Sequence, residues 1–248
     1  FRSALVARIS GARQRIGQDR NGRAKLLTVL VPPHRENGNI VPEYMTREYL
    51  RVVEPLGCAD DGRGLELVAD EIAISFLRSK ITDEGPLVGI APGAAFGPSK
   101  RWLPDRYAQV ADRLREETGV RCVLLTGPGE EDTREAVQQA AKRALIECDD
   151  GHPRIDTLKA TVSRLDLLVC NDSGPRHVAV AFGVPTVCIM GPTMPAYSCG
   201  PYEKGEVLRV DVDCGPCQKP YCSTDHRCMT RIGVDEVVAA AKRALARG

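Results

Sequence analysis

The sequence has almost no net charge and no long apolar run. Its 34 basic side chains nearly balance 33 acidic ones, which leaves a formal net charge of +1 and no overall electrostatic footprint for nucleic acid. No segment approaches the roughly 20 apolar residues of a membrane-spanning helix, and no signal peptide with a positive start and an apolar centre is present. We therefore expect a cytoplasmic protein that binds no nucleic acid.

Several catalytic signatures are also missing. There is no nucleophile elbow, no Walker loop, no HExxH and no D-x-D pair suited to holding a metal on a diphosphate. Gly127 and Gly129 form a Gly-x-Gly pair, but the third glycine of a dinucleotide fingerprint is absent and no suitable ribose-binding acid follows. These absences disfavour a dehydrogenase and favour a reaction that needs no metal or other cofactor.

From residue 87 onward, apolar runs alternate with amphipathic segments. This order is typical of an α/β fold with a mostly parallel sheet and right-handed crossovers, in which ligands bind at the carboxyl ends of the strands. The predicted strands are 87–92, 121–126, 145–148, 167–170, 185–190 and 206–211. The predicted helices are 104–118, 130–144, 156–165, 175–182 and 234–246.

The first 80 residues are less regular. Leu5, Ile9 and Ala12 share one helical stripe, which indicates a helix already in progress at the first residue, so the start of this domain is expected to be missing. The breaking sequence DEGP at 83–86 predicts a domain boundary, with one domain over 1–82 and another over 83–248. The elements predicted in the first domain are helices 1–17, 44–57 and 70–80, a strand or short helix at 25–33, a loop at 34–43 and a strand at 65–68.

Residues 167–186 predict a buried strand, a sharp polar turn and a helix. The turn Asn-Asp-Ser-Gly at 171–174 supplies capping residues, and Pro175 fits the first helical position. Helix N-termini attract anions, so the turn suits a phosphate. Asp172 would repel phosphate, which favours a contact with sugar hydroxyls or a role in ordering the turn. An ordinary strand-to-helix loop is the alternative.

Residues 88–107 contain a second candidate loop, which follows a predicted strand that ends at Pro92. Gly93 and Gly97 permit close approach of the backbone to a ligand, and the ammonium group of Lys100 is placed to reach a diphosphate. Lys100 and Asp172 both follow strands of the predicted sheet, so both belong to the same rim. Taken alone, a solvated lysine is an equally good interpretation.

The ten cysteines divide into two groups. One group falls in predicted strands and is interpreted as small core residues, namely Cys122, Cys148, Cys170 and Cys188. The other has the spacing C-x2-C-x4-C-x5-C and includes His226: Cys214, Cys217, Cys222 and Cys228. This spacing fits either a small zinc site or reduced thiols in an ordered loop, and it lacks the paired C-x2-C of a zinc ribbon.

Two stretches together carry a family resemblance. PGAAFGPSKRW (92–102) and NDSGPRHVAVAFGVPTVCIMGPT (171–193) resemble the heptosyltransferases of glycosyltransferase family 9. The opening FRSALVARISGARQRIG is similar to the later part of that family's N-terminal domain. The resemblance implies a GT-B fold of two Rossmann-like domains, with the N-terminal one incomplete. It also implies an inverting, metal-independent transfer of heptose from ADP-heptose to the lipopolysaccharide inner core.

The resemblance further implies roles for the domains and the partners. Residues 1–82 would be part of the acceptor-binding domain, and residues 83–248 would be the domain that binds the nucleotide sugar. The acceptor would be the lipid A/Kdo inner core, reached at the inner membrane surface. The family's catalytic base, an aspartate, would precede the first residue, so this chain is expected to bind donor and turn over poorly.

The resemblance also assigns individual residues. Lys100 would be catalytic, at the donor's phosphate or heptose, and Asp172 would lie nearest the sugar hydroxyls. Either Glu130 or Glu131 would face the ribose or heptose, with Glu131 preferred. The remaining substrate-binding residues would be Gly93, Ser99, Ser173, Gly174 and His177.

Two other classes of protein stay open. One is a module that binds a nucleotide or nucleotide sugar without catalysis. The other is a different Rossmann-type enzyme, such as a nucleotide-sugar epimerase, which the missing third glycine and the lack of a Tyr-x-x-x-Lys pair disfavour.

Overall fold

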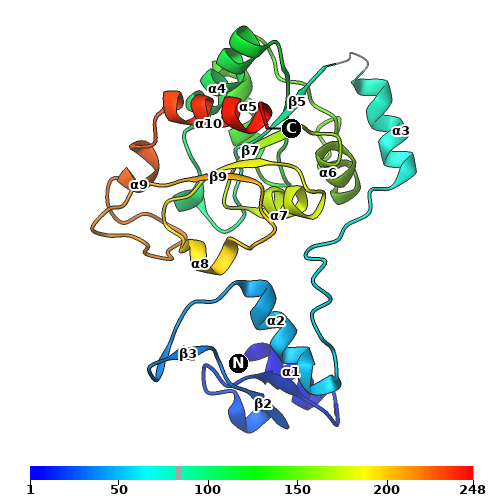
Figure 1. Cartoon of the computed structure of the whole chain (residues 1–248), viewed down its shortest axis with the longest axis vertical. Coiled ribbons are helices and arrows are strands. Elements are labelled where there is room, and N and C mark those ends of the chain that lie inside the picture. Colours follow the sequence, from blue (N-terminus) through cyan, green and yellow to red (C-terminus); the bar gives the residue numbers. More distant parts are fainter. Residues whose placement is uncertain (82–84, 248) are drawn as a thin grey trace. The chain divides into compact units, whose positions relative to one another are not determined.

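The computed structural model describes residues 1–81 and 85–247. The chain forms two compact units, shown in Figure 1. The first unit contains residues 1–63 and 195–200, and the second contains residues 64–194 and 201–248. No helix among the described residues combines the length and the apolar character needed to cross a membrane.

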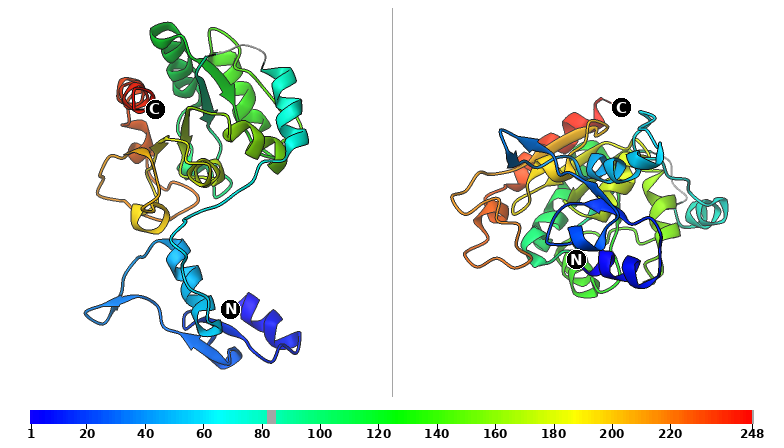
Figure 2. Two further views of the ribbon diagram at one scale, coloured as in Figure 1. Left: turned by 45° about the vertical axis from the view of Figure 1, so that its right-hand side comes forward. Right: turned by 90° about the horizontal axis from the view of Figure 1, so that it is seen from below.

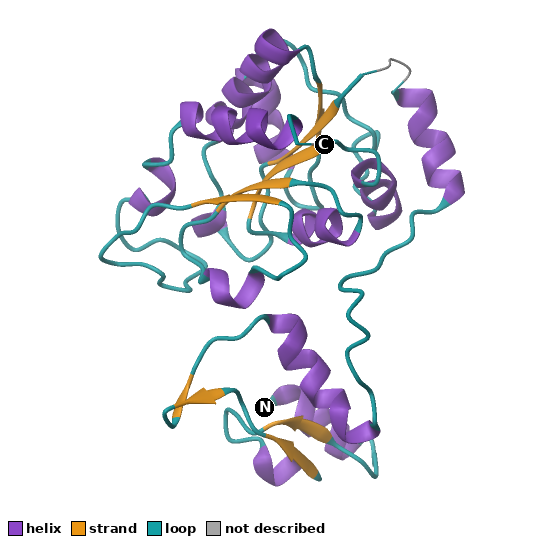
Figure 3. Cartoon of the chain, in the orientation of Figure 1, coloured by secondary structure: helices purple, strands orange, loops and turns teal. Residues whose placement is uncertain are grey.

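The second unit is built on a five-stranded sheet in which every neighbouring pair is parallel, as the sequence predicts. Its strand order is β6-β5-β7-β8-β9, and its strands are drawn in orange in Figure 3. The strands are β5 (Leu87–Ala91), β6 (Arg121–Leu124), β7 (Leu167–Asn171), β8 (Thr186–Ile189) and β9 (Gly205–Leu208). Every residue of β5 and β7 is buried, which explains why both sequences are continuously apolar up to their ends.

The strand order places a topological switch point between β5 and β7. The chain moves from β5 outward to β6, and then returns to the other side of β5 to form β7. At such a point the two following loops diverge and leave a crevice at the carboxyl ends of the strands. The loops that begin at residues 92 and 172 are therefore the ones best placed to hold a ligand.

Helices cover both faces of this sheet. Helix α4 (Pro104–Thr118) and helix α10 (Val234–Leu245) pack together, and α7 (Gly174–Ala181) packs on β7 and β8. Figure 2 shows α10 and α6 (Ile155–Val162) on opposite sides of the sheet. The remaining helices of this unit are α3 (Glu71–Lys80), the 3-10 turn η3 (Pro98–Lys100), α5 (Glu131–Ala140) and α9 (Arg227–Thr230).

The first unit is smaller and has little buried apolar surface. Ala4 and Val31 are its buried hydrophobic residues among those described. Its strands β1 and β2 pair in parallel, and an ion pair of 2.8 Å joins Arg20 to Glu48. Its elements are α1 (Arg2–Ile9), β1 (Ile16–Gln18), η1 (Ala24–Leu26), β2 (Val29–Val31), β3 (Arg35–Glu36), β4 (Asn39–Ile40), α2 (Met45–Val53), η2 (Glu54–Leu56) and α8 (Pro195–Ser198).

Three predicted elements differ most from the structure, and the helix at 130–144 and the strand at 206–211 are also shorter, at Glu131–Ala140 and Gly205–Leu208. The first helix ends at Ile9 rather than residue 17, because Gly11 adopts a φ of 76° that a helix cannot continue. Residues 65–68 form no strand, and they have no neighbouring strand to pair with among the described residues. The strand predicted at 145–148 is reduced to a single bridge between Val123 and Ile146.

The contacts also divide the chain at a different place from the predicted boundary. Helix α3 packs on α6, so residues 64–81 belong with the five-stranded sheet. The predicted boundary at residues 82 and 83 lies outside the described residues. The assignment of donor and acceptor roles to the two parts stays a prediction.

Candidate functional site

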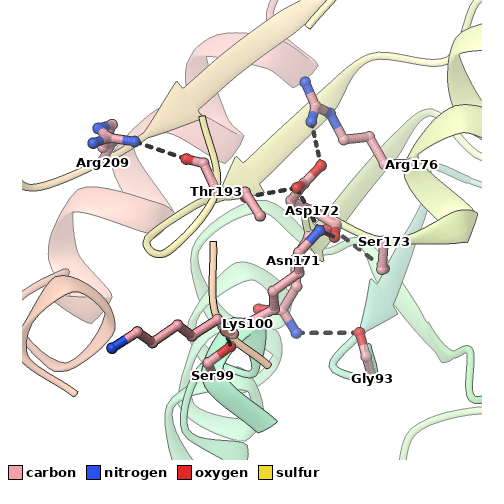
Figure 4. Close-up of polar contacts among 10 residues, drawn as sticks. Gly93, Ser99, Lys100, Asn171, Asp172, Ser173, Arg176, Thr193 and Arg209 are labelled. Carbon is pink, nitrogen blue, oxygen red and sulfur yellow. Dashed lines mark hydrogen bonds and ion pairs between the residues drawn. The ribbon is translucent and has the colours of Figure 1, made fainter. Parts of the chain in front are cut away.

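The candidate site lies at the carboxyl ends of β5 and β7, where Ala91 pairs with Cys170 (Figure 4). Asn171, fully buried, joins the two following loops. Its Nδ2 atom donates a hydrogen bond of 2.6 Å to the carbonyl oxygen of Pro92. Its Oδ1 atom accepts hydrogen bonds from the Trp102 backbone N–H (3.1 Å) and the Tyr107 hydroxyl (2.8 Å). One amide therefore fixes both ends of the loop that carries Lys100.

Asp172 is the centre of the site. Its side chain is 4% exposed, and both carboxylate oxygens accept hydrogen bonds from protein groups. Lys100 Nζ and Thr193 Oγ1 each lie 2.7 Å from Oδ2, and Arg176 Nη1 lies 2.8 Å from Oδ1. Figure 4 shows these groups converging on the carboxylate. This geometry favours the ordering role for Asp172 over a direct contact with sugar hydroxyls.

The charges around Asp172 keep it ionised. Burial opposes ionisation of Asp172. The hydrogen bond and charge of Lys100, the hydrogen bond of Thr193 and the charge of Arg176 outweigh burial and lower the pKa of Asp172 to about 2. Asp172 is therefore an anion at any physiological pH. Its negative charge holds two cations, Lys100 and Arg176.

The Lys100 ammonium is fixed by Asp172 and Phe96. Two of the three N–H groups of an ammonium are accounted for by Asp172, through Oδ2 at 2.7 Å and the backbone oxygen at 3.1 Å. The ammonium also lies 5.0 Å from the centre of the Phe96 ring, a favourable cation–π distance. The side chain is 14% exposed, so the remaining N–H is held in a partly desolvated place where charge interactions are strong.

Sequence reasoning missed Arg176, which is fully buried. Its Nη2 atom lies 2.6 Å from Glu203, and its Nη1 atom bonds to Asp172. Asp172 immediately precedes the N-cap of α7 and Arg176 lies in its first turn, so their closeness in sequence was the available signal. Two cations, Lys100 and Arg176, thus balance two carboxylates, Asp172 and Glu203.

The remaining residues of the turn begin helix α7. Gly174 is exposed at its first position, Ser173 is its N-cap, and Pro175 occupies the first turn as predicted. His177 is partly buried, and burial, followed by the charge of Arg176, lowers its pKa. The lowered pKa favours the neutral form of the His177 imidazole at physiological pH.

The structure separates Glu130 from Glu131. A side-chain carbon added at Gly93 would lie 1.9 Å from Glu130 Oε2, so the Glu130 carboxylate occupies the space beside the first loop. The same oxygen accepts a hydrogen bond of 2.7 Å from the Gly127 N–H. Glu131 instead caps the Gly129 N–H and is exposed. The geometry thus favours Glu130 over Glu131 as the acidic residue of the site.

Ser99 does not face the crevice. Its side chain is buried, and its hydroxyl donates a hydrogen bond of 2.6 Å to the carbonyl oxygen of Lys219. The contact belongs to the cysteine-rich segment, which we define as residues 214–228. Ser99 therefore supports the loop rather than offering a free hydroxyl to a substrate.

The two cysteine groups also differ in the structure. Cys122, Cys148, Cys170 and Cys188 are buried, which confirms their interpretation as core residues. The four cysteines of the cysteine-rich segment line a cavity of about 70 Å³ together with His226. Within the described ranges, no three His, Cys, Asp or Glu side chains form a group that could hold a metal ion.

The fold and the paired loops define a class of protein. Residues 1–227 match glycosyltransferase family 9 (heptosyltransferase), and the chain belongs to this family. The chain is similar to the structure of E. coli ADP-heptose LPS heptosyltransferase II, with a TM-score of 0.77 and 24% sequence identity. The match covers 99% of this chain and 74% of the E. coli chain. The chain thus has the GT-B-like fold of heptosyltransferases.

Two relatives of this chain carry the name lipooligosaccharide heptosyltransferase 2. A lipooligosaccharide heptosyltransferase 2 of Campylobacter jejuni serotype O:2 is 30% identical over 163 residues, which cover 64% of this chain and 51% of the relative. A protein of the same name from serotype O:6 is 26% identical over 249 residues, which cover 98% of this chain and 72% of the relative. The chain thus spans about half the length of the first relative and more of the second.

Proposed function

We propose that this chain is part of an inverting heptosyltransferase that transfers heptose from ADP-heptose to the lipopolysaccharide inner core. Family membership supports the reaction class. The observation that carries the proposal is the pairing of Lys100 with Asp172 at the switch point, beside the N-terminus of α7. Both groups stand where a nucleotide sugar binds in doubly wound folds.

The reaction requires groups that stabilise the negative charge on the leaving diphosphate. When the acceptor hydroxyl attacks the anomeric carbon, its proton passes to a base, the bond from that carbon to the phosphate oxygen breaks, and the electron pair leaves with ADP. Lys100 supplies a fixed positive charge for the diphosphate, and the backbone N–H groups that begin α7 add the positive end of a helix dipole. Because Asp172 already holds Lys100, little reorganisation is needed as charge develops.

The other parts of the proposal concern the donor's sugar and the acceptor. Glu130 is placed for a hydroxyl of the ribose or heptose, and His177 for a phosphate oxygen. Residues 83–248 would bind the donor, and residues 1–82 would contribute to binding lipid A/Kdo at the cytoplasmic side of the inner membrane. These assignments rest on the family resemblance and on the position of the crevice.

The test is a calorimetric titration of the 248-residue chain with ADP-heptose, ADP and NAD in metal-free buffer. We expect both adenosine diphosphate ligands to bind and NAD to bind weakly or not at all. Lys100→Ala should weaken binding by about ten- to hundredfold, the loss typical of a hydrogen bond to a charged group. Lys142→Ala is the matched control, because this lysine is exposed and pairs with Glu116 on the surface.

The outcomes separate folding from binding. A chain that melts cooperatively but binds neither ADP nor ADP-heptose would refute the donor assignment. Tight binding of NAD would favour another Rossmann-type enzyme. Equal affinities for the Lys100→Ala variant and the unaltered chain would remove Lys100 from the site.

A further inference from the structure

The cysteine-rich segment (214–228) binds every polar group of Ser99. The Ser99 hydroxyl donates to the carbonyl oxygen of Lys219 at 2.6 Å, and the Ser99 backbone N–H donates to that of Pro220 at 3.1 Å. The Ser99 carbonyl oxygen lies 2.8 Å from His226 Nε2. Because a carbonyl oxygen only accepts, the imidazole carries a hydrogen at Nε2 in this contact.

The approach of the two segments is close enough to exclude a side chain. A carbon added at Gly97 would lie 2.4 Å from the carbonyl oxygen of Pro220, and Gly97 has a φ of 152°. The turn η3 (Pro98–Lys100) therefore rests directly on the backbone of the cysteine-rich segment. Ser99 is joined to Lys100 by a peptide bond, so its three hydrogen bonds also restrict where Lys100 begins.

The same segment reaches a second loop of the site. The Gln218 backbone N–H donates to the carbonyl oxygen of Pro192 at 2.9 Å, next to Thr193. Thr193 and Lys100 both bond to Oδ2 of Asp172, each at 2.7 Å. The cysteine-rich segment thus contacts the two loops that supply both partners of this one oxygen atom.

The end of the segment is anchored in the core. Cys228 and the following residue Met229 are buried, and a side-chain carbon added at Gly191 would lie 2.5 Å from Met229 Sδ. Trp102 donates from Nε1 to the carbonyl oxygen of Ile232 at 3.2 Å, which ties the following turn to the Lys100 loop. Because the end of the cysteine-rich segment is anchored in the core, the segment is a rigid support for the loop that carries Lys100.

We propose that the cysteine-rich segment is a positioning element of the donor site, and that His226 holds Lys100 in place through Ser99. This inference rests on the proposed function, because it assigns the segment to the binding of ADP-heptose. His226 does not contact Asp172 or Lys100 directly in this arrangement; it acts on the peptide that precedes Lys100. The geometry gives the segment a role in affinity for the donor's diphosphate.

The experiment compares His226→Ala with His226→Gln in the 248-residue chain. Both substitutions place an ordinary side chain at a φ of 59°, so backbone strain is matched, and only glutamine retains an N–H donor. We expect His226→Ala to weaken ADP and ADP-heptose binding about three- to tenfold, the loss of one hydrogen bond, and His226→Gln to recover part of it. Lys142→Ala, an exposed change outside the segment, should leave affinity unchanged.

A double-mutant cycle distinguishes positioning from general stability. If His226 acts through Lys100, then His226→Ala should have no further effect on affinity in a Lys100→Ala background. Additive losses, or a lower melting temperature with unchanged affinity, would overturn the inference. If the unaltered chain binds neither ADP nor ADP-heptose, the proposed function fails; if it binds both and His226→Ala binds equally well, only this inference fails.

Discussion

The two ends of the five-stranded sheet hold their charged side chains in different ways. At the carboxyl end, Lys100 and Arg176 are paired with buried carboxylates. At the amino end, Arg78, Arg121 and Arg164 line a cavity of about 420 Å³. None of these three arginines forms an ion pair within the described part of the chain.

The two ends of the sheet therefore differ in how their cations are held. The amino-end cavity is lined by three arginines, but the topological switch point lies at the other end of the sheet. The carboxyl end has its cations fixed by Asp172 before any ligand arrives. Fixed charges stabilise a developing anion with little reorganisation, which suits a leaving diphosphate.

The largest expected effect is on stability, and it follows from removing the Asp172 carboxylate that pairs with Lys100 and Arg176. Asp172→Ala leaves Lys100 and the fully buried Arg176 without this partner, although Arg176 keeps Glu203. Breaking a buried ion pair in this way costs about 3–5 kcal/mol of unfolding free energy. Chemical denaturation monitored by circular dichroism measures this loss.

Asp211→Ala is the matched control for that substitution. Asp211 pairs with Arg209 at 3.1 Å, but its side chain is 94% exposed. An exposed pair contributes little, so the control should unfold like the unaltered chain. Equal losses in the two variants would contradict the view that burial makes the Asp172 network strong.

The second prediction uses acid to remove the same charge. The pKa of Asp172 is about 2 in the folded chain, below the ordinary value of 3.8. A lowered pKa contributes stability above the unfolded value and loses it as pH falls through the folded value, so about 2 kcal/mol should disappear between about pH 4 and pH 2. Other carboxylates also titrate here, so the measurement is the difference between the unaltered chain and Asp172→Asn across urea unfolding curves. Parallel pH profiles would count against the shifted pKa.

The parts of the fold that local sequence determines could be predicted. The continuous apolar runs at β5 and β7 gave correct strands, and the helix predicted at 104–118 has the bounds of α4. Lys100 and Asp172 were predicted to share a rim because both follow parallel strands, and the structure brings them to 2.7 Å. The helix over 1–17 failed because the apolar stripe was given more weight than Gly11.

Contacts between distant segments could not be predicted. A buried arginine at position 176 depends on Glu203, which lies 27 residues further along the chain. The hydroxyl of Ser99 points to Lys219, 120 residues away, and nothing in the local sequence marks that pair. These contacts arise when parallel strands bring their following loops together, so they depend on topology rather than on local propensity.

A third and smaller effect distinguishes the two acids beside the first loop. Glu130→Ala should weaken ADP-heptose binding about three- to tenfold if its carboxylate bonds to a sugar hydroxyl, since one hydrogen bond is lost. Glu131→Ala should change affinity little, because that carboxylate caps the exposed Gly129 N–H. Calorimetry with ADP-heptose and with ADP alone shows whether the effect lies at the heptose. A larger loss for Glu131→Ala would reverse the assignment made from Gly93.

The smallest expected effect on donor binding is at the amino end of the sheet. Arg121 begins β6, donates from Nη2 to the Gly85 carbonyl oxygen at 2.8 Å, and has Nε and Nη1 buried without a hydrogen-bond partner among the described residues. Arg121→Met retains the length of the side chain and removes a buried charge. Arg121 lies at the amino end of β6 and the candidate site at the carboxyl end of the sheet, and each strand residue adds roughly 3.3 Å between them. The affinity for ADP-heptose should therefore not change in calorimetry. A loss as large as that of Lys100→Ala would mean that the basic amino-end cavity, rather than the switch point, takes the donor's diphosphate.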